Sequence, residues 1–505
     1  MKIKIIFIGL FLLALHGVQA QSFSDALRYS RLDRNGGARS IGVMGTLGAL
    51  GADFGVLSTN PAGLASYRRS ELALSPGLYH ITNNSRLTGG DNAIYPDDLN
   101  RFHFNNGNII AVHRPRRGRW KTANLGIGIT QLATYRSQRY WEGQAPGSLT
   151  DRFVELADGL TPDELDDFEG GLAYEAGAIY DPDGDLFYTS DIQLVPTDRS
   201  GLIRKNQTIT TSGYQNELQL GFAGNYDDKL YVGATIGVPI LNYEESKEYQ
   251  EVDELDTIPF FNSLNWQENL QSSGTGINLK LGFIYRINQM FRVGAAVHTP
   301  TAFAITDNYS KELTYNFTEN GQNYNLDAQS PDGVFDYRLY TPWRLIGDIG
   351  IVLGGSDPST GIDRPSGFLS AEVEWVDYST SSFNFTPEFD NPGFRQAERI
   401  ANQAITDQLQ DALNLRMGGE LAYKIFRFRA GLGFSGTEYA NEEMWSRSWS
   451  AGLGIREEKF YIDLGFRRQT REEGYIPYAT STAPEILVNT EQVQDLFVMT
   501  LGIKL

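Results

Sequence analysis

The sequence predicts an all-β membrane protein, a 14-stranded antiparallel transmembrane β-barrel with a small, partly helical N-terminal hatch in its lumen. First, apolar and polar residues alternate from residue 70 to the end, as in Phe497, Met499 and Leu501, which is the period of a half-buried strand. Second, long and short connections alternate along this region, a pattern typical of membrane barrels. Third, the stretch before residue 70 is glycine-rich and fits neither a strand nor a regular helix.

Residues 1–20 have the order of a secretory signal peptide. Lys2 and Lys4 precede an apolar run over residues 5–15, and Ala20 ends the segment. We expect cleavage after Ala20, because the apolar run is too short to span a bilayer well as an uncleaved anchor. No later run approaches about 20 apolar residues, so an exported chain of this kind is either soluble or a barrel.

Residues 21–69 are the predicted hatch. Each glycine inside a helix costs about 1 kcal/mol relative to alanine, so this stretch favours close backbone approach over a surface helix. Asn60 is biased towards an extended conformation by the proline that follows, and Pro61 can open a short turn or helix. The glycines are at positions 36, 37, 42, 45, 48, 51 and 55.

The barrel is predicted over residues 70–505, because no Pro/Ser-rich linker divides this part of the chain. If both termini lie in the periplasm, all the long loops are extracellular. The longest loop covers 143–213. The fourteen predicted strands lie near 70–82, 107–115, 123–142, 214–226, 229–249, 274–287, 290–310, 335–353, 367–384, 412–424, 426–436, 447–456, 459–470 and 493–505. The other predicted long loops are 83–106, 250–273, 311–334, 385–411, 437–446 and 471–492.

The polar positions of these strands are expected to face the lumen, where mixed charge is ordinary for such barrels. We expect these charges to pair with one another or to hold the hatch rather than to perform chemistry. The predicted lumen network consists of Arg292, Glu372, Glu374, Arg416, Glu420, Arg427, Arg429, Asp463 and Arg467.

Composition excludes several classes of function. The formal net charge of −19 argues against binding to nucleic acid and against electrostatic attachment to an anionic membrane surface. The chain has no cysteine, which excludes disulfides, thiolate metal sites and thiol catalysis. No motif for a catalytic serine, zinc or nucleotide is present, and the scattered histidines give little support to a haem site. We therefore expect no cofactor and no enzymatic activity.

The tripeptide Asn60-Pro61-Ala62 inside a glycine-rich N-terminal segment, followed by fourteen strands, resembles the FadL/TodX family of outer-membrane transporters for hydrocarbons and long-chain fatty acids. The resemblance covers most of the mature chain. It is strongest to the Bacteroidetes members often labelled "OmpP-type transporter" or "hemin receptor", through GGARSIGVMGTLGALGADFGVLSTNPAGLA and the shorter phrases at 284–286, 298–301, 340–344 and 374–379. In that family loops capture an apolar ligand, a deeper pocket holds it, and a kinked third strand lets it leave sideways into the bilayer.

The resemblance assigns roles to particular residues. Asn60, Pro61 and Ala62 become the hatch motif, and Gln21, Ser22 and Phe23 become the mature N-terminus that gates the inner pocket. Gly126 and Gly128 in the third strand could permit a kink, although glycine in strands also marks simple close packing. Two departures from the family pattern are the long acidic loop 143–213 and a final Leu505 in place of an aromatic residue.

Two features of the long loop have alternative explanations. The apolar residues Phe153, Leu156, Leu160 and Phe168 either line a cap over a ligand or only pack a loop helix that starts near Thr161. The closely spaced carboxylates Asp181, Asp183 and Asp185 either form a weak calcium site or an ordinary Asp/Gly turn. The turn explanation needs no metal.

Taken together, the sequence predicts passive import of hydrophobic compounds such as long-chain fatty acids across the outer membrane of a Gram-negative bacterium. The expected partners are the hydrophobic ligand, outer-membrane lipid and, during biogenesis, the barrel-insertion machinery. The alternative is a barrel that does not transport and serves as a structural subunit of an envelope or secretion complex.

Overall fold

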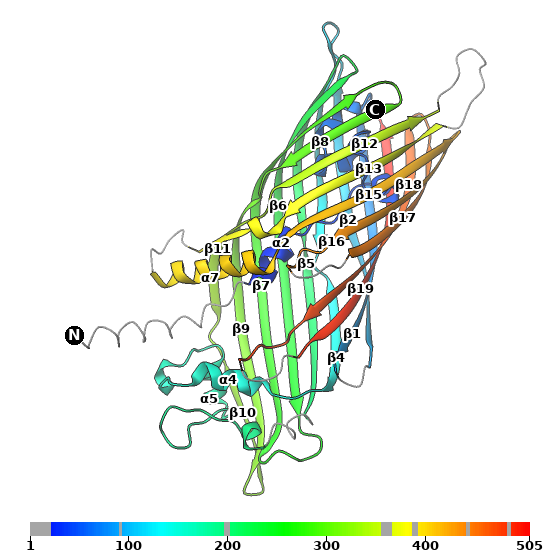
Figure 1. Cartoon of the computed structure of the whole chain (residues 1–505). Coiled ribbons are helices and arrows are strands. Elements are labelled where there is room, and N and C mark those ends of the chain that lie inside the picture. Colours follow the sequence, from blue (N-terminus) through cyan, green and yellow to red (C-terminus); the bar gives the residue numbers. More distant parts are fainter. Residues whose placement is uncertain are drawn as a thin grey trace.

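The structure is a computed structural model that describes residues 22–89, 93–195, 203–354, 366–385, 392–440, 445–481 and 486–505 (Figure 1). The predicted signal peptide, residues 1–20, and the predicted gating residue Gln21 lie outside the described residues.

The chain forms a closed antiparallel β-barrel, which confirms the predicted fold class. Each strand pairs with the next, and the pairing of β1 with β19 closes the ring. Nineteen hydrogen-bonded segments make fourteen barrel strands, because β3/β4, β8/β9, β10/β11/β12 and β13/β14 are interrupted single strands. The segments are β1 (Glu71–Leu87), β2 (Tyr95–His113), β3 (Trp120–Thr134), β4 (Ser137–Gln144), β5 (Arg204–Tyr226), β6 (Leu230–Val252), β7 (Phe261–Arg286), β8 (Phe291–His298), β9 (Ala302–Glu319), β10 (Gln322–Gln329), β11 (Gly333–Tyr340), β12 (Arg344–Leu353), β13 (Ser366–Asp377), β14 (Ser382–Asn384), β15 (Asp411–Tyr423), β16 (Phe426–Gly436), β17 (Trp445–Arg456), β18 (Phe460–Tyr475) and β19 (Val488–Lys504).

The alternation seen in the sequence corresponds to the two faces of the wall. On β15 the side chains of Leu413, Leu415 and Met417 are exposed on the outside, whereas Asn414 between them is buried towards the lumen. Apolar side chains on the outside and polar ones within are what a lipid bilayer requires of a barrel. Separately, none of the described helices combines the length and apolar character needed to cross a membrane.

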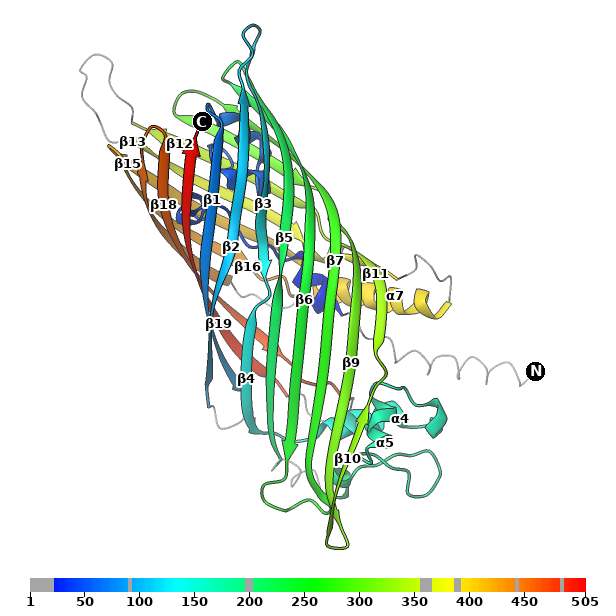
Figure 2. The same ribbon diagram turned by 180° about the vertical axis from the view of Figure 1, so that it is seen from behind.

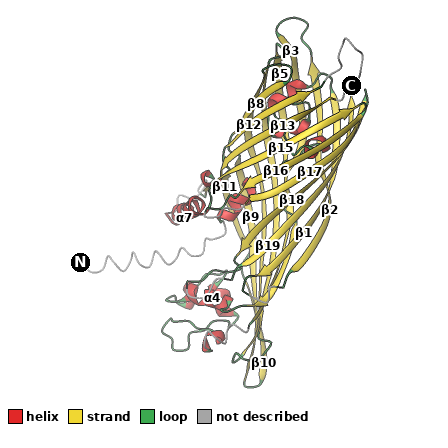
Figure 3. Cartoon of the chain, turned by 45° about the vertical axis from the view of Figure 1, so that its right-hand side comes forward, coloured by secondary structure: helices red, strands yellow, loops and turns green. Residues whose placement is uncertain are grey.

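Among the described residues, helices occur in the N-terminal segment, after β4 and after β13. Residues 22–69 lie inside the ring of strands (Figure 3). A second group follows β4, at the end of the barrel opposite the C-terminus (Figure 1). The helices are α2 (Phe23–Ser30), α3 (Ala38–Gly42), η1 (Phe54–Ser58) and η2 (Pro61–Ser66) in the lumen, α4 (Leu149–Ala157), η3 (Pro162–Glu164), α5 (Gly170–Glu175) and η4 (Asp191–Leu194) after β4, and η5 (Tyr378–Thr380) and α7 (Pro392–Gln408) after β13.

Three of the predicted long loops are mostly strand. The segments predicted as loops at 83–106, 250–273 and 311–334 instead continue β1, β2, β6, β7 and β9 and form β10. Strands β5, β6, β7 and β9 therefore extend well beyond the rest of the barrel, towards the end that carries α4 and α5 (Figure 2). In these extensions apolar side chains such as Leu264, Trp266 and Leu313 are buried and polar side chains lie on the outside, which is the reverse of a lipid-facing strand.

Candidate functional site

The Asn60 turn is enclosed by the barrel wall. Asn60 has no exposed surface, and its Oδ1 accepts a hydrogen bond from the Ala62 N–H at 3.2 Å, which caps the first turn of η2. Its Nδ2 donates to the Phe283 carbonyl at 3.2 Å and lies 3.5 Å from Asp348 Oδ2. The capped turn is thus joined to two strands of the wall.

Glycines in the wall leave room for this turn. A Cβ at Gly233 would lie 2.5 Å from the Pro61 carbonyl, and one at Gly282 would lie 2.1 Å from Asn60 Oδ1. Contacts this short do not occur between real atoms, so a side chain at either position would push the turn away from the wall. These strand glycines are structural partners of Asn60 and Pro61, which sequence analysis did not assign.

One buried ion cluster joins the N-terminal segment to β12, β13 and β15. The Nη2 of Arg34, between α2 and α3, lies 2.9 Å from Glu372 and 3.0 Å from Glu374. Arg416 bonds to the same two carboxylates at 2.9 and 3.0 Å, and Arg344 lies 3.2 Å from Glu374. Three guanidinium groups thus share two carboxylates, and one comes from the N-terminal segment.

A second cluster has the same design. Arg39 of α3 lies 3.2 Å from Glu420, which also accepts a hydrogen bond from Arg429 at 2.6 Å. Arg429 donates to Asp463 at 2.7 Å, and Arg456 bonds to Asp463 at 3.1 Å. The Arg429 and Asp463 side chains are fully buried. This pairing compensates the cost of removing their charges from water.

Three predicted members of the lumen network bind main-chain carbonyls instead. Arg467 donates to the Arg34 carbonyl at 2.6 Å, and Arg292 donates to the Leu50 carbonyl at 3.3 Å. Arg427 donates to the carbonyls of Lys424 and Phe426 in its own turn. In the described part of the chain none of the three forms an ion pair. Arg292 and Arg467 instead hold the N-terminal segment, which is the other role expected for these charges, whereas Arg427 has neither role.

Sequence analysis also missed Arg34, Arg39 and Asp348. The two arginines lie in an irregular segment without period, so no pattern assigned them a direction. Asp348 is on the polar face of β12, and its alternation with Leu345 and Ile349 would have indicated that it faces the lumen. For Asp348, a charged residue on the polar face of a predicted strand was the signal that could have identified it.

Two neighbouring cavities lie along α2. The first, of about 220 Å³, lies between the start of α2, the loop after β4 and strands β6, β7 and β9. The second, of about 280 Å³, reaches from α2 to the break between β3 and β4. Ser24, Arg28, Glu245 and Lys247 line both cavities. The two cavities therefore adjoin each other between the loop after β4 and the break in the third strand.

The second cavity is rich in basic side chains. Its lining includes Arg28, Arg31, Arg136, Arg139, Lys247 and Arg471 against the acids Asp33, Glu245 and Glu473. Five of these cations lie within 4.0 Å of a carboxylate. Among the described residues Arg136 has no acidic partner, and its side chain is exposed. It is therefore the cation best placed to meet an incoming anion.

The predicted loop residues separate into two groups. Leu156 and Phe168 line the first cavity together with Ser22, and the Phe168 ring lies 5.1 Å from that of Tyr309. Phe153 is fully buried and packs on Trp266. It therefore packs the loop onto its neighbours, as in the second of the two explanations, and does not line a cavity over a ligand.

The remaining predicted residues here lie outside the cavities. Leu160 accepts a hydrogen bond from the Tyr188 hydroxyl through its carbonyl, and Phe23 packs against the core around α2. The helix expected to start at Thr161 is one 3₁₀ turn, because the chain turns away at Leu165.

Glu169 ties this loop to the barrel. Its carboxylate accepts hydrogen bonds from Lys311 and from Arg152, both at 2.7 Å. Burial by itself would raise the pKa of Glu169, but these two cations hold that pKa below its ordinary value. The loop is therefore fixed over the first cavity by a charged contact.

The third strand is interrupted, but away from the predicted glycines. Gly126 and Gly128 pair regularly with β2 and β5 and contact Leu64 and Phe54 of the N-terminal segment. The register shifts instead between Gln131 and Ala133, and the strand is broken at 135–136. The two glycines therefore serve close packing, which was the alternative explanation.

Beyond this break the wall has a seam. β2 pairs with β3 only from Asn106 to His113, and β4 pairs with β5 alone, so no ladder joins β2 to β4 among the described residues. Asn83 of β1 donates to the Gln138 carbonyl of β4 at 2.7 Å, and the rings of Tyr95 and Tyr140 are 5.2 Å apart. Side chains, rather than a backbone ladder, close this part of the wall.

The acidic turn has no need of a metal. Oxygens of Asp181 accept hydrogen bonds from the N–H groups of Gly184 and Leu186 at 2.8 and 2.9 Å. These backbone donors lower the pKa of Asp181, the Leu186 N–H most strongly. The described residues contain no group of three His, Cys, Asp or Glu side chains that could hold a metal. Asp181, Asp183 and Asp185 therefore do not converge on one point.

No protein-family model matches the chain, and no curated protein matches it. Solved structures do. A FadL homologue from Pseudomonas aeruginosa is 12% identical over 94% of this chain and 99% of its own, with a TM-score of 0.53. The Ralstonia pickettii toluene transporter TbuX is 15% identical over 94% and 99% (TM-score 0.44), and the Pseudomonas putida toluene transporter TodX is 12% identical over 94% and 97% (TM-score 0.45).

At these identities the likeness concerns the fold and not the function. The P. aeruginosa homologue is similar over nearly the whole of both chains, so the correspondence includes the N-terminal segment as well as the strands. The chain thus has the FadL-type barrel fold.

Proposed function

We propose that the protein is an outer-membrane channel for hydrophobic compounds that carry an anionic group, with long-chain fatty acids as the ligand class. The observation that carries this proposal is the pair of cavities that share four residues and end beside the break in the third strand. A ligand would enter under the loop after β4, pass along α2 and leave through the seam between β2 and β4.

The charges of the second cavity, beside the break, support an anionic ligand. Arg136 is exposed at the break without an acidic partner among the described residues, where it could receive a carboxylate by a charge-assisted hydrogen bond. The apolar side chains of Leu156 and Phe168 in the first cavity would accept part of a hydrocarbon tail.

In this proposal the segment 21–69 acts as the hatch, and the Asn60-Pro61-Ala62 turn holds it in the lumen. The ion clusters that contain Arg34 and Arg39 keep the segment seated, so the ligand would pass beside it rather than displace it. The sideways exit spares an apolar solute a passage through water.

The seam can be tested by cross-linking, because the chain has no native cysteine. A Tyr95→Cys/Tyr140→Cys pair joined by a short thiol cross-linker would close the seam, and uptake of a labelled fatty acid into cells should fall to the level of cells without the protein. The matched control is Ile109→Cys/Ile127→Cys, where β2 and β3 are already paired and both side chains face outward.

Undiminished uptake after cross-linking at the seam would reject the sideways exit. Mass spectrometry of the purified protein tests the ligand class separately. Co-purified fatty acid supports the proposal, whereas an empty barrel at fixed stoichiometry with other envelope proteins would favour a structural subunit instead.

A further inference from the structure

The short turn between β2 and β3 is strongly basic in a chain whose net charge is −19. Within eight residues it carries Arg114, Arg116, Arg117, Arg119 and Lys121, all exposed. The ends of β1 and β6 bring more cations beside it, namely Arg68, Arg69 and Lys229, which are also exposed. The protein therefore has a local basic surface although its net charge is negative.

Few of these charges are neutralised within the protein. Arg119 lies 3.0 Å from Asp227, and Arg69 lies 3.4 Å from Glu458. In the described part of the chain Arg116 and Arg117 have no acidic partner, and Lys121 forms no ion pair, although Asp227 is near enough to attract it. Three like charges close together repel one another unless an anion lies between them.

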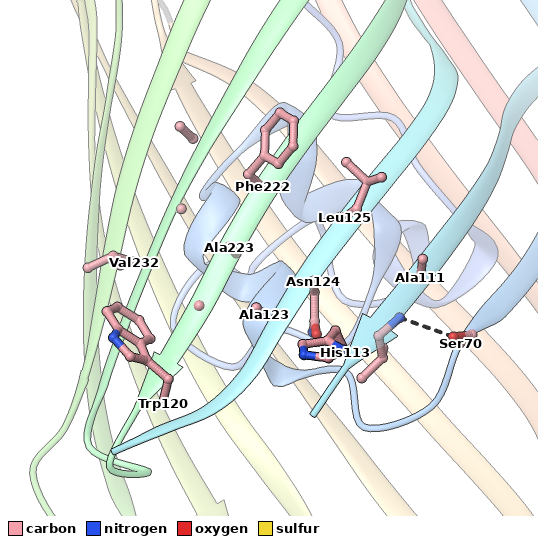
Figure 4. A pocket seen from close by; sticks show the side chains of 14 residues that line it. Ser70, Ala111, His113, Trp120, Ala123, Asn124, Leu125, Phe222, Ala223 and Val232 are labelled. Carbon is pink, nitrogen blue, oxygen red and sulfur yellow. Dashed lines mark hydrogen bonds between the residues drawn. The ribbon is translucent and has the colours of Figure 1, made fainter. Parts of the chain in front are cut away.

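An apolar groove of about 790 Å³ begins directly beside this turn, on the outer face of β2, β3, β5 and β6. Its floor is made of small outward-facing residues, Ala111, Ala123, Gly224 and Ala234. Trp120, Phe222 and Val232 stand around it (Figure 4). The indole of Trp120 covers Gly224, since a Cβ there would lie 2.6 Å from the ring.

We infer that this groove and turn bind one anionic phospholipid, with an acyl chain in the groove and the phosphate on Arg116, Arg117 and Lys121. Short turns of such barrels face the periplasm, where the adjoining leaflet consists of phospholipid. Tryptophan beside a basic cluster is the usual composition at the level of lipid headgroups. The groove thus binds the acyl chain and the basic turn binds the phosphate of the same lipid molecule.

The two halves of the site distinguish a lipid from other anions. A free phosphate would use the cations but not the groove, and a zwitterionic lipid would use the groove but gain less from the cations. Because each basic residue near a membrane surface contributes about 1 kcal/mol, two lost contacts correspond to about a 30-fold weaker affinity.

The test is native mass spectrometry of the full barrel in mild detergent, titrated with phosphatidylglycerol or with phosphatidylcholine of the same chains. The first should bind at least tenfold more tightly, and inorganic phosphate should not displace it. The double variant Arg116→Glu/Arg117→Glu should lose this preference. The control Lys424→Glu/Lys459→Glu places the same charge change on other short turns of this end and should retain it.

A separate variant, Ala123→Trp, fills the floor of the groove and should weaken both lipids alike. Equal binding of the two lipids by the wild type would overturn the role of the basic turn, and displacement by inorganic phosphate would reduce the site to an anion site. Unchanged binding in Ala123→Trp would overturn the role of the groove. A gel-mobility shift on heating shows that each variant is a folded barrel.

Discussion

Gly282 lies so close to Asn60 that a single added Cβ would come within 2.1 Å of the Asn60 Oδ1. The same holds for Gly233 and the main chain of Pro61, at 2.5 Å. The wall is therefore shaped to one turn of the N-terminal segment. A fit of this kind makes the position of that turn sensitive to the smallest side chain.

Gly233→Ala should loosen the N-terminal segment. The added methyl group meets main-chain atoms that cannot rotate away, and overpacking of this kind costs about 1–3 kcal/mol. We expect a lower unfolding midpoint and a higher ion conductance in planar bilayers. The control is Gly347→Ala on β12, where a Cβ would meet only Val373, at 3.5 Å. Equal behaviour of the two variants would show that the fit is not required.

Arg34→Met should destabilise the protein by about 3–5 kcal/mol, because it leaves Glu372 and Glu374 buried with one guanidinium fewer. Arg69→Met, whose exposed ion pair with Glu458 is on the surface, should cost no more than about 1 kcal/mol. Urea unfolding followed by tryptophan fluorescence measures both. A similar small loss for the two variants would mean that Arg416 and Arg344 neutralise the carboxylates alone.

Asp181 should order its turn without metal. Its pKa lies below the ordinary value of 3.8, so the ionised form is favoured by the fold. The stabilisation is then complete above the ordinary pKa and is lost as the pH falls through the lowered one. Hydrogen exchange at Gly184 and Leu186 should speed up only in strong acid and should not respond to EDTA. Asp183→Asn should leave these exchange rates unchanged. Slower exchange on adding calcium would instead support the calcium site.

The wall of the barrel was predictable because lipid imposes a strict rule on every strand. Leu413, Leu415 and Met417 had to face one way, and the alternation displayed this directly. Beyond the lipid-facing part of the wall, the outward positions no longer need to be apolar. The continuation of β6 and β7 was predicted as loop for this reason. The break at 135–136 was missed for a related reason, since nothing in Tyr135 or Arg136 marks the end of a ladder.

The contacts between the N-terminal segment and the wall were only partly predictable. Asn60 and Pro61 were found because a pre-proline residue and a proline restrict the backbone locally. Arg34 and Gly282 were not, because their importance depends on partners more than 200 residues away. Charges such as Glu372 were placed correctly in the lumen, but their partners could not be read from the sequence.

Arg136→Ala should weaken binding of fatty acids without affecting the barrel. In the described part of the chain this side chain has no acidic partner, so removing it leaves no buried charge uncompensated, and the cavity beside the break keeps its shape. A hydrogen bond to a charged group contributes about 1.5–3 kcal/mol, which corresponds to about a 10- to 150-fold loss of affinity for the carboxylate. The alcohol of the same chain length should bind wild type and variant alike. Arg86→Ala, an exposed arginine of β1 outside the cavities, is the control. If the alcohol and the acid lose affinity equally, Arg136 acts through the shape of the cavity, and an anionic ligand is no longer favoured.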